Sequence, residues 1–129
     1  MENLAEVNAA NWEQEVSKSE MLTVVYFWHD RCPWCLRFTP LLNEIAVRFA
    51  GKMKFLRLNM LDSPTNKEIA ANFGVMSTPT LLFICGGRPV GQVVGYVSSE
   101  DLKKALNDIH RRYQACLTQS TQLKDAYVV

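Results

Sequence analysis

The stretch that decides the fold runs from Met21 to Leu36, MLTVVYFWHDRCPWCL. It begins with an apolar, β-branched and aromatic run over residues 22–28, whose length and composition predict a buried strand. A short polar turn follows, and a Cys-Pro-Trp-Cys motif occupies residues 32–35. Apolar side chains then recur at helical spacing over residues 36–50. Two cysteines therefore stand where a central strand passes into a helix, which is typical of a redox-active cysteine pair.

The start of a helix favours a reactive thiolate. The first N–H groups of a helix have no partners within it, and the helix dipole places partial positive charge there. Pro33 suits the first helical turn, because its missing N–H would have no partner anyway. The two-residue spacing also lets both sulfurs close a small disulfide ring. We expect Cys32 to be the exposed, attacking sulfur and Cys35 the shielded, resolving one.

Several separated segments resemble the thioredoxin family over residues 1–112. Residues 24–46 resemble the family's strand, active site and kinked helix, with Pro40 at the position of the helix proline. Residues 74–84 resemble the loop whose proline is cis and faces the cysteines, which maps onto Pro79. Residues 86–106 resemble the last hairpin and helix, with Gly95 at the family's glycine beside the active site.

The resemblance implies an α/β thioredoxin fold, with a central mixed sheet of four to five strands flanked by about four helices. This domain covers residues 1–112, and residues 113–129 are expected to form a helical extension or a mobile tail. The patterns along the chain predict its elements: an edge strand at 3–7, a helix capped by Asn8 or Asn11, a second parallel strand at 53–60, a helix from Ser63-Pro64 to about Phe73, an antiparallel hairpin over 79–96, and a last helix after Ser98.

A docking surface for partner proteins is also implied by the resemblance. In the family, the loop with the cis proline offers backbone groups to an extended substrate peptide. Thr78 and Pro79 occupy that loop here, and Met76 and Gly95 are expected to extend the surface. Trp34 stands on an exposed turn, where a large aromatic side chain favours a contact role over a core role.

Two positions depart from the family pattern. The family usually has a buried aspartate in the central strand, which accepts the proton of the resolving cysteine, and this chain has Tyr26 there. The residue before the first cysteine, usually tryptophan, is Arg31. The Pro-Trp pair between the cysteines is closer to the Pro-Tyr of glutaredoxins and the Pro-His of bacterial oxidants. We expect Tyr26, Asp30, Arg31 and Pro33 to tune the cysteine pair, with Arg31 favouring the thiolate and Asp30 opposing it.

Composition indicates an ordinary globular protein. The 129 residues are 48% hydrophobic and 21% charged, which suits one domain with a real core. A net charge of +1 gives no argument for nucleic acid or a membrane surface as a partner. No apolar run reaches the roughly 20 residues of a membrane span. The N-terminus has neither the basic region nor the apolar core of a signal peptide, so we expect a cytoplasmic location.

The remaining cysteines and histidines suggest no further site. Four cysteines in such a chain do not indicate a structural disulfide framework. Cys85 and Cys116 have no close cysteine partner in the sequence, so we predict that they are incidental, with a regulatory or intermolecular disulfide at Cys116 as the alternative. Zinc needs four ligands, and His29 and His110 stand alone. We expect no metal and no cofactor beyond the Cys32–Cys35 disulfide.

The predicted function is thiol–disulfide exchange by a protein-disulfide reductase. Its partners would be proteins with disulfides and an upstream reductase, and we expect the chain to be a monomer. A disulfide oxidase or isomerase, a glutaredoxin-like enzyme, and a binding module without catalysis are the alternatives. The sequence alone leaves these open.

Overall fold

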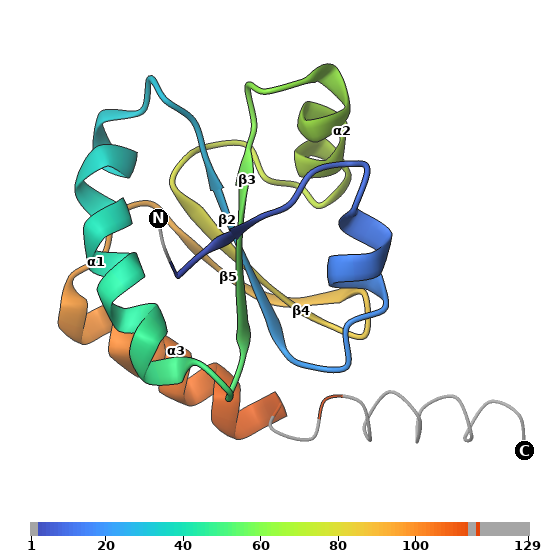
Figure 1. The fold of residues 1–129 in the computed structure, drawn as a ribbon. Helices are drawn as coiled ribbons and strands as arrows, with labels where there is room; N and C mark the ends of the chain where they lie inside the picture. The colour runs from blue at the N-terminus through green and yellow to red at the C-terminus, as the bar shows by residue number, and fades with distance from the viewer. Residues whose placement is uncertain (1–2, 114–115, 117–129) are drawn as a thin grey trace, which may run out of the picture.

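The computed structural model describes residues 3–113 and residue 116. One five-stranded sheet forms the centre, with the strand order β1-β3-β2-β4-β5. The helices cover both faces of this sheet, α1 and α3 on one side and α2 on the other (Figure 1). The elements are β1 (Ala5–Glu6), a short π-helical turn (Glu13–Ser17), β2 (Thr23–Trp28), α1 (Pro33–Phe49), β3 (Lys54–Asn59), α2 (Pro64–Asn72), β4 (Thr80–Cys85), β5 (Arg88–Val94) and α3 (Ser99–Tyr113).

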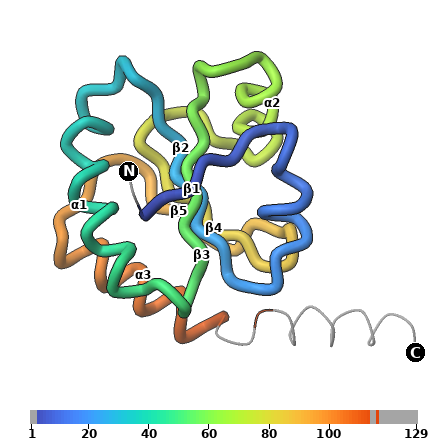
Figure 2. The backbone as a smooth tube through the Cα atoms, viewed as in Figure 1, coloured from blue at the N-terminus to red at the C-terminus, as the bar shows by residue number. Residues whose placement is uncertain are grey.

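The sheet is mixed, as the sequence predicts. β2 pairs in parallel with β3 and antiparallel with β4, and β4 pairs antiparallel with β5. β1 pairs in parallel with β3 and forms one edge, which confirms the predicted edge strand. The tube in Figure 2 shows how α1 and α3 lie together beside the sheet, away from α2. The thioredoxin fold expected from the sequence is therefore confirmed.

β2 is the central strand because both of its faces are apolar. Val24 and Tyr26 belong to the core between the sheet and the helices α1 and α3. Val25 and Phe27 belong to the second core, on the side of α2. All four side chains are at most 1% exposed. A strand buried on both faces gives the following turn and helix a fixed starting point.

The helices begin at the residues that the sequence indicates. Ser63 Oγ accepts the N–H of Asn66 at 3.1 Å at the start of α2, and Ser98 Oγ accepts the N–H of Asp101 at 3.1 Å before α3. The helix predicted after Asn8 is reduced to the short π-helical turn. Asn8 Oδ1 accepts the N–H of Ala10 at 2.8 Å, so it caps the preceding turn instead.

The prediction for Cys85 and Cys116 is wrong, because the two residues form a disulfide. Their Cα atoms are 5.7 Å apart although 31 residues separate them in the sequence. α3 runs along the sheet and returns the chain to the end of β4, which local sequence patterns do not reveal. Both cysteines are at most 5% exposed and join the core beneath α1 and α3.

The prediction of a helical extension or tail at residues 113–129 lies outside the described residues, except at Tyr113 and Cys116. Tyr113 is the last residue of α3 and packs against the core of that face. Within the described part of the chain, no helix is long and apolar enough to cross a membrane.

Candidate active site

The cysteine pair lies at the start of α1, directly after the turn that connects β2 to this helix. Cys32 and Cys35 form a disulfide with Cα atoms 5.1 Å apart. Cys32 is the N-cap of α1, and its Sγ accepts the N–H of Cys35 at 3.1 Å. Pro33 occupies the first helical position. A backbone N–H directed at a sulfur at a helix N-terminus stabilises negative charge on that sulfur once the disulfide is reduced.

The two cysteine residues differ only slightly in exposure. Cys32 is 5% exposed and Cys35 is 1% exposed in the disulfide form. Cys32 is the more exposed residue of the pair, but the open exposure expected for it is absent in this state. The attacking and resolving roles stay predictions. Pro33 and Trp34 take the exposed positions of the turn instead.

A cleft of about 280 Å³ lies beside the cysteine turn. Its lining residues are Trp34, Thr78, Pro79, Gly95 and Tyr96. The Thr78–Pro79 peptide bond is cis, and the Pro79 carbonyl oxygen accepts the N–H of Gly95 at 2.8 Å. The structure therefore brings together four of the five residues expected at the docking surface. Met76 does not line the cleft, although its side chain is 94% exposed.

Tyr96 is the residue of this cleft that the sequence analysis missed. Its ring centroid lies 5.6 Å from that of Trp34 and 5.7 Å from that of Phe38. The guanidinium of Arg37 lies 5.1 Å from the centre of the Trp34 ring, at cation–π distance. In the sequence, the position of Tyr96 directly after Gly95 was the available signal that it lies at the cleft.

Tyr26 lies under the cysteine turn and is fully buried. Its hydroxyl donates to the carbonyl oxygen of Cys35 at 3.3 Å and is 2.9 Å from Thr39 Oγ1. Thr39 Oγ1 also donates to the Cys35 carbonyl oxygen, at 2.8 Å. Burial raises the pKa of Tyr26 above its ordinary value of 10.0, and the hydrogen bond with Thr39 lowers it in part. Tyr26 is therefore a neutral hydrogen-bond donor near pH 7 and cannot act as a base there.

The polar residues before the motif lie exposed on the turn. The backbone N–H of Arg31 donates to His29 Nδ1 at 3.2 Å, and the side chains of Asp30 and Arg31 face solvent. Among the residues that the structure describes, no group of three or more histidine, cysteine, aspartate or glutamate side chains is arranged to hold a metal ion.

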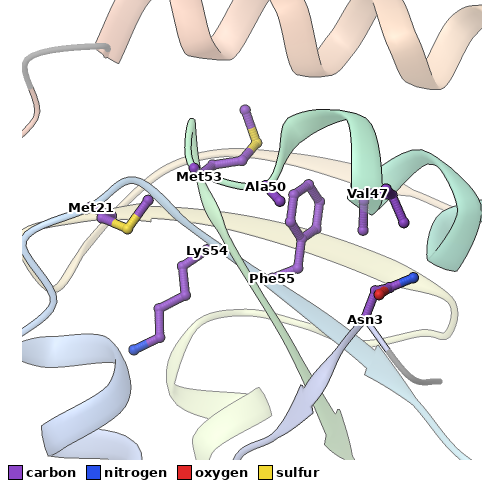
Figure 3. A pocket seen from close by; sticks show the side chains of 9 residues that line it. Asn3, Met21, Val47, Ala50, Met53, Lys54 and Phe55 are labelled. Atoms are coloured by element: carbon purple, nitrogen blue, oxygen red, sulfur yellow. The ribbon is translucent and has the colours of Figure 1, made fainter.

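A second, larger hollow of about 380 Å³ lies at the opposite end of α1 from the cysteine pair (Figure 3). Apolar side chains surround it, among them Met21, Met53 and Phe55. Lys54 also lines this hollow, and its amine forms an ion pair with the carboxylate of Glu15 at 3.0 Å. This hollow has no chemistry of its own, and we assign it no role.

The mixed sheet and the disulfide at the start of the helix after its central strand define a thiol–disulfide oxidoreductase of the thioredoxin class. Comparisons with known proteins agree. The family model described as Thioredoxin matches residues 3–108. Since that match covers most of the sequence, the chain belongs to the thioredoxin family.

Individual relatives match over most of their own length. Thioredoxin 1 of Nostoc sp. is 34% identical over 106 residues, which cover 82% of this chain and 96% of the relative. The thioredoxin of Alicyclobacillus acidocaldarius is 37% identical over 100 residues, covering 78% and 91%. That of Haemophilus influenzae is 36% identical over 107 residues, covering 83% and 97%. The similarity thus extends beyond the cysteine motif to the whole domain.

Proposed function

We propose that the protein is a protein-disulfide reductase in which Cys32 attacks and Cys35 resolves. The hydrogen bond from the Cys35 N–H to Cys32 Sγ is the observation that carries these roles. An ordinary cysteine, with a pKa of about 8.5, is only about 3% thiolate at pH 7. The N–H directed at Cys32 Sγ would favour the thiolate form of that sulfur and leave Cys35 as the second thiol.

The exchange proceeds in two displacements. The Cys32 thiolate attacks one sulfur of a partner disulfide, which forms a mixed disulfide and releases the partner's other sulfur as a thiolate. Cys35 then loses its proton and attacks the sulfur of Cys32, releasing the second partner thiolate. The partner gains two electrons and, after protonation, two thiols. An upstream dithiol reductase must return two electrons to the Cys32–Cys35 disulfide.

We assign supporting roles to the residues around the pair. Thr78, Pro79, Gly95 and Trp34 line the cleft in which the partner's backbone and side chains would dock. The exposed side chain of Met76 extends this apolar surface beyond the cleft.

The residues of the turn would tune the reactivity of the cysteines. Pro33 fixes the first turn of α1, Arg31 favours negative charge on Cys32, and Asp30 opposes it. Tyr26 holds the Cys35 turn through the Cys35 carbonyl oxygen.

We further propose that the protein is a monomer working in the cytoplasm, with residues 1–112 as its catalytic domain. The second candidate function is that of a disulfide oxidase or isomerase. The Cys85–Cys116 disulfide favours this second candidate. Structural disulfides persist mainly in oxidising compartments, where disulfide formation rather than reduction is needed. The Pro-Trp pair between the active-site cysteines points the same way.

Insulin reduction with dithiothreitol tests the proposal. The wild-type protein should accelerate it, and Cys32→Ser and Cys35→Ser should not. No acceleration by a protein whose Cys32–Cys35 disulfide does form would indicate a binding module. The reduction potential separates the two catalytic candidates. A reduction potential of about −270 mV, as in thioredoxin, supports a reductase. A reduction potential of about −120 mV supports an oxidase.

A further inference from the structure

Four aromatic rings connect the cleft with the buried side of the active site. The ring centroids are 5.6 Å apart from Trp34 to Tyr96, 5.7 Å from Tyr96 to Phe38, and 5.8 Å from Phe38 to Tyr26. Phe38 and Tyr26 are fully buried, whereas Trp34 is 52% and Tyr96 is 44% exposed. The rings of Trp34 and Tyr96 are therefore exposed, and the buried ring of Phe38 packs against Tyr96.

The rings of Trp34 and Tyr96 both line the cleft. Arg37 holds the Trp34 ring through its cation–π contact, and Phe38 supports the Tyr96 ring. Gly95 contributes no side chain to the cleft, and its N–H is occupied by the Pro79 carbonyl. A volume of about 280 Å³ is near the lower end for ligand pockets, which span roughly 300–1,000 Å³. The cleft is therefore small for a free ligand and has room for one large side chain.

We propose that Trp34 and Tyr96 form an aromatic slot that selects partner proteins with a large apolar side chain beside the cysteine that Cys32 attacks. This inference rests on the proposed function, since the partner is held at Cys32 during exchange. Trp34 lies two positions after Cys32 in the same turn, so a residue that flanks the partner's cysteine would lie close to the slot. An apolar side chain between the two rings buries apolar area, which favours binding, whereas a charged side chain loses its hydration there, which disfavours binding.

Tyr96 is then a specificity-determining residue that acts through its ring. The hydroxyl is not needed, so Tyr96→Phe should behave like the wild-type protein, while Tyr96→Ala should lose one wall. Trp34→Ala removes the other wall independently. Val94→Ala is the matched control, because Val94 is an exposed apolar residue, 56% accessible, only two positions before Tyr96 and outside the cleft lining.

The test uses short peptides with one cysteine joined by a disulfide to thionitrobenzoate, a good leaving group whose release is coloured. The residue after the cysteine is Phe, Leu, Gly or Asp. Second-order rates of release by the reduced protein are measured for each variant. The wild-type protein, Tyr96→Phe and Val94→Ala should prefer the Phe and Leu peptides over Gly by about tenfold, with Asp slowest. Tyr96→Ala and Trp34→Ala should each reduce that ratio to within about twofold.

The ratio between peptides cancels any change in the intrinsic reactivity of Cys32. Equal rates for all four peptides with the wild-type protein, or a preference for Asp, would overturn the slot while leaving thiol–disulfide exchange intact. A preference that survives both alanine substitutions would overturn it as well. The bis-thionitrobenzoate disulfide, which has no peptide, tests the proposed function itself. If the reduced protein does not react with that compound or with any peptide, both the proposed function and the slot fail.

Discussion

Tyr26 shows how one buried residue sets what the active site can do. Its phenol donates to the carbonyl oxygen of Cys35, and Thr39 shares the same acceptor. The Cys35 turn is thus held from below by two hydroxyl groups instead of standing above a carboxylate. In the proposed exchange, Cys35 would therefore lose its proton to water or to an exposed group, for which Asp30 is a candidate.

Removing the phenol should change how stability depends on pH. Because burial raises the pKa of Tyr26 in the folded state, its contribution is fully present below pH 10 and is lost as the pH rises through 10 towards the folded pKa. The wild-type protein should therefore lose more stability between pH 9 and pH 11 than Tyr26→Phe does. Near pH 7 the substitution should cost about 1 kcal/mol for the lost hydrogen bond. Urea unfolding of both proteins at several pH values checks this, and parallel curves would contradict it.

A carboxylate at the same position should speed resolution. Tyr26→Asp places a base under Cys35, so its mixed disulfides should resolve faster than those of the wild-type protein above neutral pH. The loss of the ring and the burial of a carboxylate should cost about 3–5 kcal/mol of stability. Single-turnover reduction of a model disulfide across pH 6–9 measures the effect. If the two pH profiles superimpose, Tyr26 is core packing only.

At the scale of elements, the disulfide between Cys85 and Cys116 joins the end of β4 to the chain after α3. It lies at the opposite end of β4 from Pro79, so it is remote from the cysteine pair at the start of α1. Closing a loop of 31 residues restricts the unfolded chain more than the folded one. The bond should therefore stabilise the fold without taking part in exchange.

Cys116→Ser should lower the free energy of unfolding by about 3–4 kcal/mol, the size expected for a loop of this length. The double variant Cys85→Ser, Cys116→Ser should lose about the same amount as either single one, because all three remove one bond. Urea unfolding under oxidising conditions measures these values. A loss below about 1 kcal/mol would show that the bond does not hold α3.

Sequence patterns predicted the elements well where the signal was local. The apolar run of β2, the Ser63-Pro64 start of α2 and the glycines between β4 and β5 each set their own boundaries. The partner of Cys85 could not be predicted, because it depends on where α3 returns the chain. The position of Tyr96 after Gly95 was a signal for the cleft, but its contacts with Trp34 and Phe38 come from distant segments and could not be predicted. The helix after Asn8 was overpredicted because the asparagine caps a turn instead.

In the whole molecule, the active site and the second disulfide lie at opposite ends of the layer that the sheet forms with α1 and α3. The cysteine pair, the cleft and the aromatic rings gather around the turn between β2 and α1. The course of that turn can be followed in the ribbon of Figure 1. The second disulfide and the larger hollow lie towards the other end of α1 and β4. A partner docked at the cleft would therefore be remote from the second disulfide.

The most direct measurement is the capture of a partner by single-cysteine variants of the active site. Cys35→Ser, mixed with a protein disulfide substrate, should accumulate a one-to-one mixed disulfide, and peptide mass mapping should place the bond at Cys32. Cys32→Ser should accumulate none under the same conditions, and Cys116→Ser should exchange without accumulating any. Capture through Cys35 in Cys32→Ser, or through Cys85 or Cys116 in any variant, would contradict the account.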